Sequence, residues 1–194
     1  MKEQIRRLAE TASALRAGTS THFPITRLTS IKSLCQEPEI AAQFVCYLAE
    51  RTLAKVQARS CPAYTDPADW LRYGSLITEA IPLMREYLQT PTQRYLAQLW
   101  EVLRQAEAVQ TFTGAQVWGR PLRTIHSGDV LVVENALRCV VSPTAAAFWA
   151  YQTAKDYTEC YDWRYGTGLI PESLPMLEDI IGFWTDRAQS PTVA

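Results

Sequence analysis

One stretch of this chain occurs twice in similar form. "WLRYGSLITEAIPLMRE" (Trp70 to Glu86) recurs as "WRYGTGLIPESLPMLED" (Trp163 to Asp179), with one residue lost and one gained. Trp, Arg, Tyr, Gly, Leu, Ile, Glu and Pro follow one another in the same order in both copies. A block of this length repeated within one chain indicates an internal duplication, which constrains the fold to two similar halves.

Two further pairs of blocks extend the match in both directions. Arg6–Arg16 resembles Arg94–Arg104, and Cys35–Arg51 resembles Cys139–Lys155. In the second of these registers Phe44 corresponds to Phe148. Insertions separate the blocks, as expected of loops, which tolerate changes in length.

The order of the blocks is the same in both halves of the chain. We therefore predict a first helical repeat over residues 1–90 and a second over residues 91–194, packed together as one globular unit. By analogy with a fused symmetric dimer, such halves are expected to pack about a pseudo-two-fold axis.

Hydrophobic periodicity predicts helices throughout. Apolar residues recur at helical spacing over residues 2–17 and 171–187, and residues 129–141 fit either a helix or, in part, a strand. Pro38 and Pro143 have the position expected of the first residue of a helix. The fold class is therefore predicted to be all-α, with about eight helices.

Two segments interrupt this helical pattern. Glycines at Gly74 and Gly166 predict a helix end at each Arg-Tyr-Gly sequence, with Pro82 in the first turns of the next helix. Residues 111–123 have no counterpart in the first half, and their alternation and two glycines predict a short hairpin or an ordered loop.

Composition excludes several classes of protein. Of 194 residues 47% are apolar, and the net charge of −1 lacks the basic excess of a nucleic-acid-binding protein. No uncharged apolar run approaches the ~18 residues of a membrane span, and charges throughout the first turns argue against a secretory signal. We expect a cytoplasmic protein.

The five cysteines predict neither a metal site nor a disulfide framework. Their number is odd, no pair has C-x-x-C spacing, and no cluster of metal ligands accompanies them. We expect Cys35 and Cys46 to be reduced thiols packed as small apolar side chains. No cofactor is indicated, and common nucleotide-binding and hydrolase motifs are absent from the sequence.

The two histidines, His22 and His126, occupy matching positions before predicted helices. They would be a base or ligand pair if the fold brought them together. The alternative, which we favour, is a capping or loop histidine copied by duplication, because no other ligands lie near them in the sequence.

Aromatic and basic residues form a stripe in each half. Tyr47 and Arg51 follow Phe44 at helical spacing, and Tyr151 and Lys155 follow Phe148 in the same way. Such a cation would bind an anionic ligand or a carboxylate of a partner. The alternative is a core face whose long cation extends to water.

Three other residues are candidates for binding. Arg72 and Arg164 lie beside aromatic residues in the repeated block, where they would either bind a ligand or hold the end of a helix. Trp118, in the unmatched insertion, would pack on the core or contact a partner.

Three hypotheses on function follow from these features. The favoured one is a non-catalytic α-helical interaction or assembly protein, a dimer or a partner complex, because six Trp and nine Tyr are residue types enriched at interfaces. A second is a helical module that binds a small apolar or aromatic ligand among Phe44, Phe148, Trp149 and Tyr151. A third is an unusual enzyme that uses His126 or His22 with nearby carboxylates.

Overall fold

The structure is a computed structural model of the chain. It describes residues 1–19, 23–58, 67–117, 120–123, 128–158, 161–162, 166–169 and 173–189.

Eight α-helices make up most of the described residues, which confirms the predicted all-α class. In chain order they are α1 (Lys2–Arg16), α2 (Ser30–Leu34), α3 (Pro38–Ala58), α4 (Pro67–Gln89), α5 (Gln93–Gln110), α6 (Gly128–Val141), α7 (Ala146–Tyr157) and α8 (Leu174–Gln189). Two 3-10 turns, η1 (Ile25–Thr29) and η2 (Pro143–Ala145), precede α2 and α7.

Several local predictions are confirmed. Helix α3 begins at Pro38, and Pro143 begins the 3-10 turn that leads into α7. The ambiguous segment at residues 129–141 is helical within α6. Helix α1 ends before Gly18, whose φ of 65° is the left-handed conformation that favours glycine.

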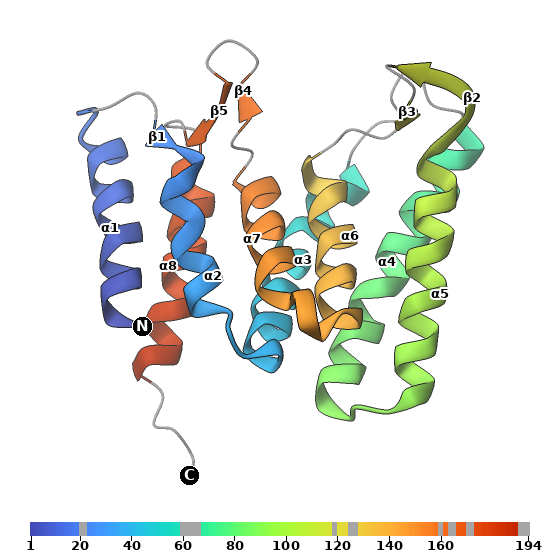
Figure 1. Ribbon diagram of the computed structural model, residues 1–194, viewed down its shortest axis with the longest axis horizontal. Helices are drawn as coiled ribbons and strands as arrows, with labels where there is room; N and C mark the ends of the chain where they lie inside the picture. Colours follow the sequence, from blue (N-terminus) through green and yellow to red (C-terminus); the bar gives the residue numbers. More distant parts are fainter. Residues whose placement is uncertain are drawn as a thin grey trace.

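Short strands complete the fold at one end of the helical array. Strands β2 (Thr111–Val117) and β3 (Arg120–Arg123) pair antiparallel, the hairpin being one of the two alternatives predicted at residues 111–123. Strands β1 (Phe23–Pro24), β4 (Tyr161–Asp162) and β5 (Gly166–Leu169) pair antiparallel in the order β1-β5-β4. All five strands lie at the same end of the helices (Figure 1).

The helices of the two halves interleave. The first helix of each half packs against the last helix of the other, as α1 does with α8 and α5 with α4. In the centre, α3 packs against both α6 and α7. Buried apolar side chains from residues 1–90 and 91–194 form one continuous cluster, so the halves share a single core.

The repeated block that begins at Trp70 and Trp163 takes different structures in the two halves. Gly74 lies inside α4, so the predicted helix end there is wrong, and Gly166 belongs to strand β5. Pro82 also lies well inside α4 instead of near its start. A helix tolerates a glycine at a cost of about 1 kcal/mol, and here α4 packs on α3, α5 and α6, contacts that offset this cost.

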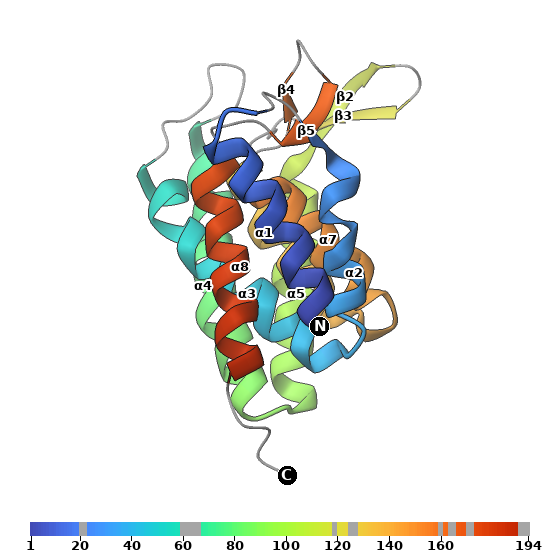
Figure 2. The same ribbon diagram turned by 90° about the vertical axis from the view of Figure 1, so that its left-hand side faces the viewer.

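The fourth helices of the two halves are not placed symmetrically. Figure 2 shows α4 and α8 both on the side of the molecule occupied by α3, whereas α7 and α2 lie toward the opposite side. Helix α3 therefore packs against α4 and also receives side-chain contacts from Asp179 and Phe183 of α8.

The described cysteines are part of the core. Cys35, Cys46 and Cys139 are free and buried, and burial raises the pKa of each thiol, to about 12 for Cys46 and Cys139. They are therefore protonated, unreactive apolar side chains, as predicted for Cys35 and Cys46.

No single helix in the described part of the chain is long and apolar enough to cross a membrane; one bent pair, Leu131–Val141 with Pro143–Tyr157, meets that requirement by length and composition.

Candidate functional site

The stripe predicted on the first half lies on α3 and is closed by α8. The guanidinium of Arg51 lies 3.0 Å from Oδ1 of Asp179 on α8, and the hydroxyl of Tyr157 on α7 donates to Oδ2 of the same carboxylate at 2.6 Å. The hydroxyl of Tyr47 also donates to the backbone carbonyl of Asp179 at 3.4 Å. The anion that Arg51 binds is thus a carboxylate of the protein itself.

The electrostatics of this cluster favour the contacts seen. Burial, and then the adjoining Asp179 carboxylate, raises the pKa of Tyr157, so its hydroxyl keeps the proton that it donates. Burial also raises the pKa of Tyr47. The Arg51 guanidinium lies 4.6 Å from the centre of the Tyr47 ring, within cation–π range.

Aromatic side chains of α8 cover the rest of the α3 stripe. The Phe44 ring lies 5.2 Å from the rings of both Phe183 and Trp184, and Phe183 also packs against Tyr47 at 5.1 Å. Phe44 is consequently 0% exposed. Helix α8 therefore places an acid and, four and five residues later, two aromatic rings on this stripe.

The matched stripe on α7 is exposed at its first residue, Phe148. Phe148, which corresponds to the buried Phe44, is 45% exposed, and its ring meets only its neighbour Trp149 in an edge contact at 4.9 Å among the described rings. The ammonium of Lys32 on α2 lies 4.6 Å from the ring centre of Tyr151. We define the α7 face as Phe148, Trp149, Tyr151 and Lys155.

A polar network joins the α7 face to α6 and α5. The Arg138 guanidinium lies 5.0 Å from the centre of the Trp149 ring and donates to Glu107 of α5 at 2.7 Å. It also forms an ion pair with the fully buried Glu134 and donates to Asn135 at 3.2 Å.

Asn135 extends this network to α7. Its amide donates to the carboxyl group of Asp156 at 2.7 Å. Burial raises the pKa of Asp156 to about 6, with a smaller contribution from the charge of Glu134. The carboxyl group is therefore only partly ionised just below neutral pH.

This network has no charged counterpart in the first half. In the register that aligns Phe44 with Phe148, the buried Ile31, Leu34 and Thr52 occupy the positions of Asn135, Arg138 and Asp156. An uncharged packing thus occurs at the matched positions, and the charged residues at these positions belong to the second half.

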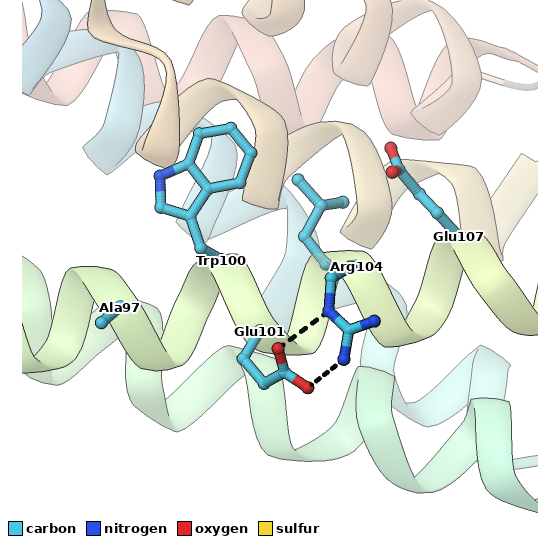
Figure 3. A pocket seen from close by; sticks show the side chains of 6 residues that line it. Ala97, Trp100, Glu101, Arg104 and Glu107 are labelled. Carbon is cyan, nitrogen blue, oxygen red and sulfur yellow. Dashed lines mark hydrogen bonds and ion pairs between the residues drawn. The ribbon is translucent and has the colours of Figure 1, made fainter.

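An open groove lies along α5, next to the network. It has a volume of about 550 Å³ and is lined by Ala97, Trp100, Glu101, Leu103, Arg104 and Glu107. Figure 3 shows Trp100 and Glu107 on one side of α5, and Glu101 and Arg104 joined by two contacts, 2.7 and 2.9 Å, on the other. Trp100 is 48% exposed.

Several predicted site residues cannot be placed relative to this site. His22, His126, Arg164 and Trp118 lie outside the described residues. Arg72 is exposed on α4. Among the residues that the structure describes, no three potential metal ligands come together.

The small-ligand hypothesis needs a closed pocket among four aromatic residues. Phe44 is buried against α8, whereas Phe148 is about half exposed on α7, so these rings do not face one enclosed space. That hypothesis and the histidine-based enzyme stay predictions.

Sequence reasoning missed Asp179, Lys32, Arg138 and Trp100. Asp179 lies in the repeated block, and its partner Arg51 was identified, but only the tertiary fold brings them together. Trp100 was detectable in principle, because it corresponds to the small Ala12 in the matched block.

Comparisons with protein-family models, with curated proteins and with solved structures found no match.

Proposed function

We propose that this chain is a non-catalytic α-helical interaction protein and that its α7 face binds a protein partner. One observation carries the proposal: Phe148 is 45% exposed, whereas the matched Phe44 is 0% exposed beneath α8. Aromatic residues, phenylalanine among them, are enriched at protein interfaces relative to the rest of the surface.

The comparison of the two stripes uses the internal duplication, which we infer from the order of the elements. In each half, a helix ends near a matched cysteine, α2 near Cys35 and α6 near Cys139. A proline and a further helix, α3 or α7, follow it. The aligned blocks at the starts of the halves, Arg6–Arg16 and Arg94–Arg104, lie on α1 and α5.

The surroundings of the α7 face also fit an interface. Arg138 and Trp149 are of the residue types that dominate binding energies, and their mutual contact holds both side chains in place before binding. Arg138 already pairs with Glu107 and Glu134, so this residue needs no counter-ion from the partner. The α5 groove with Trp100 extends this surface.

The test compares Phe148→Ala with Leu71→Ala in the full chain. Leu71 is 72% exposed on α4, so its truncation removes exposed apolar surface away from the proposed site. Each variant, tagged and expressed in the cells of origin, is cross-linked and purified, and co-purifying proteins are quantified by mass spectrometry. Sedimentation of the purified chain reports self-association in parallel.

We expect a specific protein, or a second copy of the chain, to be recovered with the wild type and with Leu71→Ala. Its recovery with Phe148→Ala should fall at least about tenfold, the effect of losing a hot-spot side chain. Equal recovery with both variants would refute the assignment of the partner to this face.

A further inference from the structure

The contacts of α8 with the stripe on α3 show what kind of segment fits the α7 face. Building on the proposed function, we infer that the partner contributes an amphipathic helix with a carboxylate one turn before an aromatic side chain. This helix would lie on α7 as α8 lies on α3.

Helix α8 supplies the template. Its Asp179 binds Arg51 at 3.0 Å, and its Phe183, four residues later, packs on Phe44 at 5.2 Å and on Tyr47 at 5.1 Å. Residues four apart lie on the same side of a helix, so a single helix face provides both contacts. An acidic and an aromatic side chain, four residues apart on α8, thus contact the stripe of α3.

The α7 face presents the same chemistry at matched positions. Phe148 and Tyr151 replace Phe44 and Tyr47, and Lys155 replaces Arg51. Lys155 is partly exposed, and its charge also acts on the neighbouring Asp156 carboxyl group, so an incoming carboxylate would share this cation. Lys32, over the ring of Tyr151, adds a second cation at this face. Two cations next to an exposed aromatic ring complement a helix that carries a carboxylate followed by an aromatic residue.

The helices that the structure describes do not supply this segment. In the register of the repeated block, Thr90 and Pro91 correspond to Phe183 and Trp184, and α4 ends just before them at Gln89. Helix α4 instead packs on α3, α5 and α6. The aromatic rings of α8 are already in contact with α3, so a second copy of the chain offers no free α8 while it stays folded.

A synthetic peptide with the sequence of α8, "LPMLEDIIGFWTDRAQ" (residues 174–189), is a suitable probe. Its binding to the full-length protein is measured by fluorescence anisotropy of an N-terminal dye, with a scrambled peptide and Leu71→Ala as controls. We expect saturable binding that Phe148→Ala weakens at least about tenfold, as does Phe183→Ala in the peptide.

A charge exchange tests the predicted ion pair. Lys155→Glu in the protein should weaken its binding of the wild-type peptide. Asp179→Lys in the peptide should weaken binding of the peptide to the wild-type protein. Combining the two changes should restore most of the lost affinity. A merely structural role of Lys155 would not be rescued by a change in the peptide.

Two outcomes would overturn the inference. In the first, the peptide does not bind the protein, although Phe148→Ala still abolishes recovery of the cellular partner. The α7 face then binds a partner of another kind, and the proposed function stands. The other is binding that Phe148→Ala leaves unchanged, which would mean that the peptide displaces α8 from α3. Failure of the proposed function itself shows separately, as partner recovery that does not depend on Phe148.

Discussion

The substitution Asp156→Asn should stabilise the protein, and by an amount that depends on pH. Asp156 lies in the network between α6 and α7, where burial raises its pKa from 3.8 to about 6. Since the pKa is higher in the fold than in the unfolded chain, ionisation opposes folding. Asp156 therefore does not destabilise the fold below about pH 4, where its carboxyl group is protonated in both states. Stability is lost as the pH rises through 6, where the carboxyl group in the fold has to ionise.

The magnitude follows from the two pKa values. Each pKa unit corresponds to about 1.4 kcal/mol. A pKa raised from 3.8 to about 6 therefore lowers the free energy of unfolding by about 3 kcal/mol at neutral pH and above. About 1 kcal/mol of this is already present at pH 4.5. Asparagine cannot ionise, and its side-chain oxygen can still accept the bond from Asn135.

The assay is urea unfolding of the wild type, Asp156→Asn and the control Glu86→Gln at pH 4.5 and pH 8. Glu86 is exposed on α4, so its variant removes one carboxylate from the surface. We expect the stability difference between Asp156→Asn and wild type to grow by about 2 kcal/mol between the two pH values. An equal difference at both would refute the argument that burial raises this pKa.

Three further predictions test the packing. Tyr157→Phe removes the hydroxyl bound to the α8 carboxylate at 2.6 Å and should cost about 1–2 kcal/mol in urea unfolding, and a variant as stable as wild type would contradict that bond. Phe44→Ala should cost about 3–5 kcal/mol, but Phe148→Ala under about 1 kcal/mol, since only the first leaves a cavity; equal losses would show that Phe148 is covered. The fragments 1–90 and 91–194 should each lack a cooperative thermal transition and regain one when mixed, because their core is shared; a cooperative transition in either alone would show independent folding.

Local structure was largely predictable because it depends on near neighbours in the chain. The spacing of apolar residues identified α1 and α8 and left α6 open between helix and strand, and the prolines at Pro38 and Pro143 marked helix starts. The prediction of a helix end at Gly74 was wrong, because contacts of α4 with three other helices offset a weak local preference.

The candidate site was predictable only in part. The stripe of Tyr47 and Arg51 was recognised, but the sequence left open whether Arg51 binds a ligand or a carboxylate. Its partner Asp179 is 128 residues away in the chain, and no periodicity links residues so far apart.

By itself, therefore, the sequence determined the helical class, limited residues 111–123 to a hairpin or an ordered loop, and placed aromatic and basic residues at helical spacing on two segments. Only the tertiary structure decided that Phe44 and Phe148 differ in exposure. Helices α4 and α8 both lie on the side of α3, so α8 buries Phe44 and leaves the matched Phe148 at the surface. Which helix covers which face depends on the joint packing of all the helices, and similar local sequences cannot specify it.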